Sequence, residues 1–502
     1  MRPRGSPCIY LMIPILLLAL GLRLAPWGQN RFLEDEALYA YWGLQIASGA
    51  DPMLDLEPVD KPPLYPYMLA LSAWLVGPTE TAARLPSLLA SLTSVALLYA
   101  LARELYGDVR VGLLAALLLA LSPFDILFAS TAFTDPLMTA LVLAALLTAA
   151  KGNLGAAGLL AALAAASKQQ GLLFLPLVVI VGWLSPGSRL RKSRAKARGR
   201  LPKSILRSGW LRCVLGFALI AAGVIWWDLA REQRPGFLEQ SLLSYGGLGP
   251  VQAAALVERA AGWLALAGDF WGSTWFSALL AGLLALWIAG SLVSERFARL
   301  HAVDLVLLAF VLGFLLLHWL VGFQVWDRYL LALVPLAAML AARALVALGD
   351  AIEATAWRRI YAAGTGLALI LMLVRPVWLA TQSELPLGGD HGAYDGIDAV
   401  AAYMRAEAPP ESVLYHYWLG HHHRFYLYGA PLRQHWYPDL EDLARDATVY
   451  RREPRYIAFP SWRGRTAAEA ALVAAGISLT PVLETTRRDG SLSFRLYRLE
   501  GP

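Results

Sequence analysis

The stretch Leu33-Glu34-Asp35-Glu36-Ala37-Leu38-Tyr39-Ala40 places three consecutive carboxylates directly after the first long apolar run of the chain, which extends from about Cys8 to Pro26. The segment Lys61-Pro62-Pro63-Leu64-Tyr65 closes the same loop. Charged residues are common at helix ends beside a membrane, where they cost little free energy. These carboxylates are therefore either a helix cap or a site, and the rest of the chain must decide between the two.

The composition is that of a membrane protein. The 502 residues are 58% hydrophobic and only 16% charged, and the mean hydropathy is +0.51. These values exclude a soluble globular protein and indicate a polytopic membrane protein. The formal net charge of +6 is explained by basic loops on the cytoplasmic side and does not indicate nucleic-acid binding. The two cysteines, Cys8 and Cys213, support neither a disulfide framework nor a metal cluster.

The number of membrane crossings follows from the positions of the basic loops. The densest basic run, residues 189–212, should face the cytoplasm, so an even number of crossings precedes it if the N-terminus is inside. This parity holds if residues 64–77 form an interfacial or re-entrant helix and do not cross. With ~20 residues per crossing, the sequence predicts about 11 transmembrane helices plus interfacial helices. The outer face then carries Asp35, Lys61, Asp135, Lys168 and Arg328.

The composition changes toward the C-terminus, where proline, glycine, charged residues and short β-rich runs become frequent. We therefore divide the chain into a transmembrane domain, residues 1–380, with its first outer loop at 27–80, and an extracytoplasmic soluble domain, residues 381–502. Three runs predict strands: Ser412–Trp418, Arg455–Phe459 and Ser491–Tyr497. Arg487-Arg-Asp-Gly-Ser is a hairpin turn signal before the last of them. A small α/β or α+β fold is expected.

Histidines gather in this C-terminal part, at His416, His421, His422, His423 and His435. Three adjacent histidines cannot all point at one ion from a regular strand, and no Cys/His spacing supports a zinc site. We therefore expect a solvated loop here and assign no metal site.

The polar residues of the predicted outer face lie at the ends of apolar segments, so they could converge on one cavity at the membrane edge. A carboxylate that is partly withdrawn from water can remove a proton from a hydroxyl. A lysine or arginine can hold a phosphate, and arginine does so with a planar fork. This combination suits a charged lipid headgroup.

Six short motifs follow one another along the chain: Asp35-Glu36, Lys61-Pro62-Pro63-Leu64-Tyr65, Ala83-Arg84-Leu85-Pro86-Ser87, Thr134-Asp135-Pro136, Ser167-Lys168 and Arg328-Tyr329-Leu330-Leu331. They occur in the order found in C-type glycosyltransferases. The chain resembles the superfamily of the dolichyl-phosphate-mannose–protein mannosyltransferases and the aminoarabinose lipid A transferases over roughly residues 8–380. The resemblance implies an inverting transfer of a hexose or pentose from a polyprenyl-phosphate carrier to an acceptor hydroxyl on the outer face of the plasma (cytoplasmic) membrane.

The resemblance also implies roles for the acidic residues. Asp35 is the expected general base for the acceptor hydroxyl, with helix capping as the alternative. Glu36 is expected to position Asp35 or the acceptor. Asp135 is expected to be a second acid that binds acceptor or sugar hydroxyls, with a buried helix cap as the alternative.

The cations are expected to bind the phosphate of the lipid carrier. Lys61 resembles the family's carrier-phosphate ligand, with a snorkelling interfacial lysine as the alternative. Arg328 is a second phosphate ligand, unless it simply pairs with Asp327. Lys168 is a weaker candidate, more interfacial than catalytic.

Donor, acceptor and cofactor are only partly constrained. The implied partners are a polyprenyl-phosphate sugar, an acceptor on a lipid, glycan or protein, and membrane lipids. No cofactor is required, and a divalent metal is an open alternative without support in the sequence. Asp60 stands where some relatives carry glutamate, a departure that bears on any accessory metal site. A lipid-linked glycan transporter or flippase, or an oligosaccharide ligase or polymerase, are the alternative functions. A transporter should show internal repeats and charges at mid-membrane, and no repeat is apparent.

Overall fold

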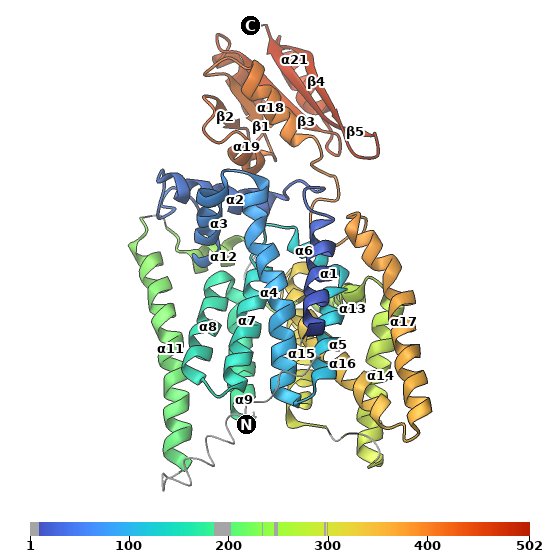
Figure 1. The fold of residues 1–502 in the computed structure, drawn as a ribbon. Coiled ribbons are helices and arrows are strands. Elements are labelled where there is room, and N and C mark those ends of the chain that lie inside the picture. Colours follow the sequence, from blue (N-terminus) through green and yellow to red (C-terminus); the bar gives the residue numbers. More distant parts are fainter. Residues whose placement is uncertain are drawn as a thin grey trace.

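A bundle of apolar helices with a small sheet domain at one end makes up the protein (Figure 1). The computed structural model describes residues 10–184, 202–232, 234–244, 249–295, 298 and 300–501. Two features of the sequence, Cys8 and the basic residues 189–201, lie outside the described residues.

Among the described residues, six helical segments are long and apolar enough to cross a membrane. These contain α4 (Glu80–Tyr106), α11 (Pro202–Ala230), α14 (Thr274–Val293), α15 (Ala302–Leu320), α16 (Val334–Asp350) and α17 (Thr355–Thr381). A seventh crossing results if α5 (Val109–Ala120) and α6 (Pro123–Ala129), which meet at a 60° bend, form one span. The prediction of about 11 transmembrane helices is therefore not confirmed, although the helical membrane fold is.

Shorter elements lie between these helices or at the end of the bundle that carries the sheet domain (Figure 1). They are α1 (Met12–Leu24), α2 (Glu34–Ser48), α3 (Leu64–Val76), α7 (Asp135–Ala150), α8 (Leu154–Ser167), η2 (Gln169–Phe174), α9 (Leu175–Leu184), α12 (Phe237–Ser244), η3 (Ala253–Ala255), α13 (Leu256–Gly268), η4 (Asp269–Trp271) and η5 (Asp327–Leu333).

Helix α3 lies beside α2 at the end of the bundle that carries the sheet domain (Figure 1). Its 13 residues extend over about 20 Å, which is shorter than the ~30 Å hydrocarbon core. The two helices approach closely at Gly43, where an added Cβ would lie 2.8 Å from the Leu69 Cβ. This arrangement agrees with the prediction that residues 64–77 do not cross the membrane.

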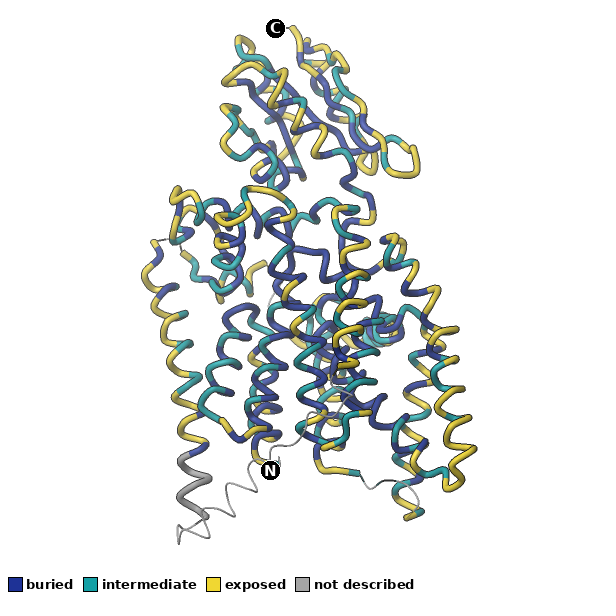
Figure 2. The backbone as a smooth tube through the Cα atoms, viewed as in Figure 1, coloured by how far each residue is buried: buried dark blue, intermediate teal, exposed yellow. Residues whose placement is uncertain are grey.

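Burial divides the bundle into a protected centre and an apolar outer surface. In the segment that contains α16, 89% of an 18-residue apolar stretch is buried. In α11 only 11% of such a stretch is buried. Figure 2 shows exposed residues along the outermost helices and buried residues between them. Large apolar side chains are exposed there, such as Leu219 and Trp226 on α11. Such a surface requires a lipid environment, because in water it would be a continuous exposed apolar patch.

Helix α17 ends at Thr381, and residues 382–501, called the sheet domain below, contain a five-stranded sheet of order β2-β1-β3-β5-β4. Its strands are β1 (Val413–His416), β2 (Arg433–Trp436), β3 (Arg455–Pro460), β4 (Ser478–Thr486) and β5 (Leu492–Glu500). β1 pairs in parallel with β2 and β3, whereas β5 is antiparallel to β3 and β4. Its helices are α18 (Ile397–Glu407), α19 (Gly420–Tyr426), α20 (Leu440–Val449) and α21 (Thr466–Ala474).

The predicted strands and hairpin are present in the sheet domain. The three β-rich runs form β1, β3 and β5, and the turn between β4 and β5 closes where the Arg487 amide donates to the Ser491 carbonyl at 2.8 Å. Strand β2 was not predicted, because this edge strand has four residues and none of them is buried.

Candidate active site

Asp35 lies in the first turn of α2, at the end of the bundle that faces the sheet domain. Its neighbour Glu36 fixes this turn, because one carboxylate oxygen accepts the Leu33 amide at 2.9 Å and the other accepts the Ala132 amide at 2.6 Å. Glu36 is fully buried, and burial raises its pKa to about 7, against the influence of Arg84 and the two backbone amides. Glu36 therefore holds the turn that carries Asp35, and its carboxylate is not exposed.

Arg328 pairs directly with Asp35. Arg328 Nη1 donates a hydrogen bond to Asp35 Oδ2, with 2.7 Å between the two atoms. The Asp35 side chain remains 38% exposed. The alternative pairing with Asp327 does not form, because the Asp327 carboxylate accepts the backbone amides of Arg328 and Gly388 at 2.7 and 2.8 Å. The guanidinium also lies over the ring of Trp326, 4.3 Å from its centroid. Asp35 is thus a charged, accessible carboxylate held by a buried cation.

Lys61 lies close to this pair. Its ammonium is 2.5 Å from the Asp60 carboxylate, and the side chain is buried. Burial lowers the pKa of Lys61, while the charges of Asp60 and Asp35 act in the opposite direction. Burial also disfavours the charged form of Asp35, but Arg328 and Lys61 outweigh it and hold the pKa of Asp35 below its usual value. The Lys61 ammonium is therefore buried against a carboxylate, whereas a snorkelling lysine would extend its ammonium into the interface.

Asp135 and Lys168 form a buried ion pair of their own, with 2.5 Å between Nζ and Oδ1. Asp135 is 1% exposed and Lys168 is 6% exposed. The Lys168 ammonium lies 4.4 Å from the centroid of the Tyr329 ring, the residue after Arg328. The structure therefore brings both residues to the group around Arg328, but it places the pair behind Tyr329 in the interior.

The motif Ala83–Ser87 supports the loop that precedes Asp35. Arg84 donates to the Asn30 carbonyl at 2.8 Å and pairs with Glu80 at 2.8 Å. Ser87 lies 3.1 Å from the Tyr65 hydroxyl. These contacts join α4 to both ends of the first loop, so this motif holds the loop that carries Asp35.

The sheet domain also contacts the start of α2, which the sequence analysis did not predict. His422 donates from Nε2 to the Phe32 carbonyl at 2.8 Å, and the Asp390 carboxylate accepts the Arg31 amide at 3.1 Å. The Tyr394 hydroxyl donates to Glu34. Residues 31, 32 and 34, which flank Asp35 on its N-terminal side, are therefore all held by the sheet domain.

The prediction of a solvated histidine loop is wrong. Residues 421–423 lie on α19, where His422 and His423 are buried, and the His422 ring stacks on Tyr394 with 4.1 Å between centroids. The spacing of His422, Phe425 and Tyr426 is that of one helix face, and this face packs on Phe32. The helical period could have revealed the face, but α19 has only seven residues. In the described part of the chain, no group of three or more His, Cys, Asp or Glu residues is arranged to hold a metal ion.

Comparison with known proteins places this geometry in context. Residues 60–227 match the family model described as dolichyl-phosphate-mannose-protein mannosyltransferase. The structure is similar to that of ArnT from Cupriavidus metallidurans bound to undecaprenyl phosphate, with a TM-score of 0.61 and 16% sequence identity over 98% of each chain. The apo state of the same ArnT gives a TM-score of 0.63 at 16% identity, again over 98% of each chain. The chain has the fold of the C-type glycosyltransferases.

The same fold extends to a second group of structures. The oligosaccharyltransferase of Archaeoglobus fulgidus is similar with a TM-score of 0.56 and 12% identity, over 98% of this chain and 74% of that one. No match was found among curated proteins. The resemblance to C-type glycosyltransferases is thus confirmed. The family match includes Lys61, Asp135 and Lys168, whereas Asp35 and Arg328 lie outside it.

Proposed function

We propose that the protein transfers a sugar from a polyprenyl-phosphate carrier to an acceptor hydroxyl, with inversion at the anomeric carbon. The observation that carries this proposal is the accessible carboxylate of Asp35 between two buried cations, Arg328 at 2.7 Å and Lys61 within its electrostatic field. Such a group offers a base and an anion site at one place. The C-type glycosyltransferase fold and the match to the mannosyltransferase family model support it.

Lys61 and Arg328 are the proposed ligands of the carrier phosphate. Charge-assisted hydrogen bonds from a lysine and an arginine fork are among the strongest contacts that a phosphate can make. The bound molecule named for the similar ArnT structure, undecaprenyl phosphate, is a carrier of this class. When phosphate binds, Arg328 can turn part of its donors from Asp35 to the ligand, which makes Asp35 a stronger base as the donor arrives.

The proposed reaction is a single displacement. The acceptor oxygen attacks the anomeric carbon and forms the new C–O bond, while the bond from that carbon to the phosphate oxygen breaks. The proton of the acceptor hydroxyl moves to Asp35, and the electron pair of the broken bond leaves with the phosphate, whose charge Lys61 and Arg328 stabilise. Asp135 and Lys168 support Arg328 through Tyr329, and no redox cofactor takes part.

The site is proposed to face outward from the plasma membrane. Asp35 and the sheet domain share one end of the bundle (Figure 1). At the other end, Arg103 and Arg110 flank the turn from α4 to α5, and Arg358 and Arg359 begin α17. Basic residues prefer the cytoplasmic side, so this asymmetry supports an extracytoplasmic site.

The size of the transferred glycan separates two versions of the proposal. The similarity to an oligosaccharyltransferase makes transfer of a lipid-linked oligosaccharide the second candidate. A transporter is not favoured, because its charged residues would lie near the middle of the membrane.

The test uses purified protein in lipid nanodiscs and a panel of polyprenyl-phosphate sugars. Release of polyprenyl phosphate, followed by mass spectrometry, is expected for at least one donor. Asp35→Asn should abolish release, while Glu407→Gln, which alters an exposed carboxylate at the end of α18, should leave it unchanged. Release by Asp35→Asn at the wild-type rate would contradict the role of Asp35, and export of intact donor without release would favour a transporter.

A further inference from the structure

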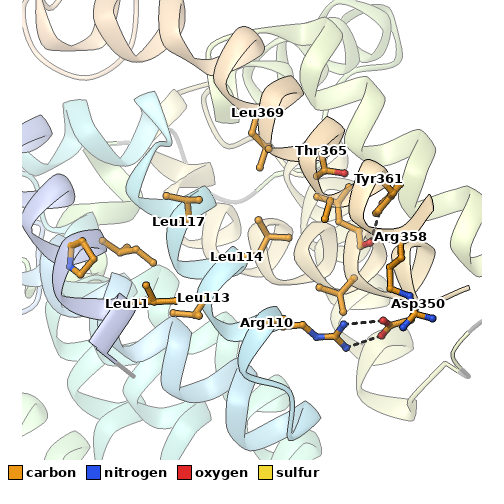
Figure 3. Close-up of a pocket in the computed structure, with 17 residues that line it drawn as sticks. Leu11, Arg110, Leu113, Leu114, Leu117, Asp350, Arg358, Tyr361, Thr365 and Leu369 are labelled. Atoms are coloured by element: carbon orange, nitrogen blue, oxygen red, sulfur yellow. Dashed lines mark hydrogen bonds and ion pairs between the residues drawn. The ribbon is translucent and has the colours of Figure 1, made fainter. Parts of the chain in front are cut away.

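A largely apolar groove lies between α1, α5, α16 and α17 (Figure 3). Its volume is about 570 Å³, within the range of ~300–1,000 Å³ that is typical of ligand pockets. Leucines from α5 and α17 line it, while Arg110, Asp350 and Arg358 gather at one end. These three residues lie where α5 and α17 begin and α16 ends, so the charged end is on the side of the bundle opposite Asp35.

The groove has the length of one lipid leaflet. Arg358 and Leu369 both line it and lie eleven residues apart on α17, which corresponds to about 16 Å along the helix axis. Half of the ~30 Å hydrocarbon core is about 15 Å. The groove is therefore about as long as one acyl chain, which reaches from the membrane surface to the midplane.

One of the two arginines at the charged end of the groove has no carboxylate partner among the described residues. Arg110 is neutralised by two carboxylates, since it donates to Asp350 at 2.7 and 2.8 Å and to Asp108 at 2.8 Å. Arg358 instead donates from Nε and Nη2 to the Ile352 carbonyl, and no carboxylate of the described residues forms an ion pair with it. The preceding residue, Trp357, is 65% exposed, and tryptophan beside arginine is typical of a membrane interface.

We propose that this groove binds an anionic phospholipid of the leaflet opposite Asp35. One acyl chain fills the space between α5, α16 and α17, and the headgroup phosphate contacts Arg358, whose charge lacks a carboxylate partner. The lipid stabilises the packing of α17 on α16. It adds to a direct hydrogen bond between these helices, in which the Tyr361 hydroxyl donates to the Leu345 carbonyl at 3.0 Å. Because α17 leads into the sheet domain, this lipid stabilises the connection between bundle and sheet domain.

Two glycines of α17 allow a matched test of the acyl-chain position. Gly366 lines the groove, and an added Cβ there meets no atom within 4 Å. Gly364 is equally unobstructed but is not part of the groove. Gly366→Phe should fill the groove and weaken binding of dioleoyl phosphatidylglycerol at least tenfold, as measured by native mass spectrometry of delipidated protein in detergent. Gly364→Phe should bind like the wild type.

Two neighbouring arginines test the headgroup. Wild-type protein should bind phosphatidylglycerol at least fivefold more tightly than phosphatidylcholine with the same chains, and phosphatidylglycerol should give the larger rise in Tm. Arg358→Gln should remove this preference, whereas Arg359→Gln, at a position outside the groove, should retain it. Arg358 is exposed, so this variant tests the proposal even if Gly366→Phe fails to fold.

Three results would overturn the proposal. The first is equal binding of phosphatidylglycerol by Gly366→Phe and the wild type, and the second is equal affinity of the wild type for the two phospholipids. The third is occupation of the groove by polyprenyl phosphate that phosphatidylglycerol does not displace. None of these readouts depends on glycosyl transfer, so the proposal stands or falls separately from the proposed function.

Discussion

The Arg328 guanidinium and the Asp35 carboxylate, 293 residues apart in the sequence, meet at 2.7 Å at the end of the bundle that faces the sheet domain. The pair joins the first turn of α2 to η5, the element that leads into α16. Because Asp35 keeps 38% of its side chain exposed while Arg328 is buried, the cation is fixed in the protein and the carboxylate faces outward. This asymmetry makes the pair suitable for an acceptor on one side and a lipid phosphate on the other.

Replacement of Arg328 should change the pH dependence of transfer. Arg328→Gln removes a cation that holds the pKa of Asp35 below its usual value, so the pKa rises and the unprotonated base is lost at a higher pH. The acidic limb of kcat/KM should therefore move upward in pH. The maximal rate should fall about 100-fold or more because a donor to the leaving phosphate is lost. An acidic limb at the wild-type pH would show that Asp35 is not the titrating base.

Replacement of Lys61 should weaken donor binding. A charge-assisted hydrogen bond contributes roughly 1.5–3 kcal/mol, so Lys61→Gln should raise the apparent KM for the polyprenyl-phosphate sugar by about 10- to 100-fold. The KM for the acceptor should change little. Lys151→Gln is the control, because Lys151 is an exposed lysine at the end of α7, away from Asp35. An unchanged donor KM in Lys61→Gln would argue against the phosphate contact.

Loss of the contact between the sheet domain and α2 should lower turnover without changing donor binding. Tyr394→Phe removes only the hydroxyl that donates to Glu34, a hydrogen bond worth about 1 kcal/mol. We expect kcat to fall several-fold at an unchanged donor KM, because Asp35 is less well fixed while Lys61 and Arg328 stay in place. Tyr403→Phe on α18 is the matched control. Equal kcat in both variants would show that the Tyr394 hydroxyl does not position Asp35.

The sequence predicted those parts of the molecule whose signals are local or periodic. Charge parity predicted that the run 64–77 does not cross the membrane; the 13 residues of α3 agree with this, because a crossing needs ~20 residues, but the non-crossing stays a prediction. The charge parity and the motif order predicted that the six candidate residues lie at one end of the bundle. The pairing of Arg328 with Asp35 could not be predicted, because the neighbouring Asp327 offered a local partner whose carboxylate instead binds two backbone amides.

Other features depend on contacts between distant segments. The crossing number is not fixed by composition because α7, α8 and α9 are too short to count as spans by themselves. The burial of His422 results from packing between the sheet domain and Phe32, 390 residues away. A run of histidines that is polar by composition therefore gave a wrong expectation of exposure.

Acidification should loosen this contact between His422 and the first loop. Burial lowers the pKa of His422 to about 4, while the Phe32 carbonyl and Glu34 act in the opposite direction. The unfolded chain, with a histidine pKa of ~6.5, therefore binds more protons between pH 6.5 and 4, and the free energy of unfolding falls as the pH falls through this window. His422→Gln keeps a donor for the Phe32 carbonyl but does not titrate, so its Tm should fall less steeply from pH 7 to pH 5. His435→Gln, which alters a less buried histidine of the sheet domain, is the control for the substitution. Parallel curves for all three proteins would mean that His422 does not link the sheet domain to the first loop in a pH-dependent way.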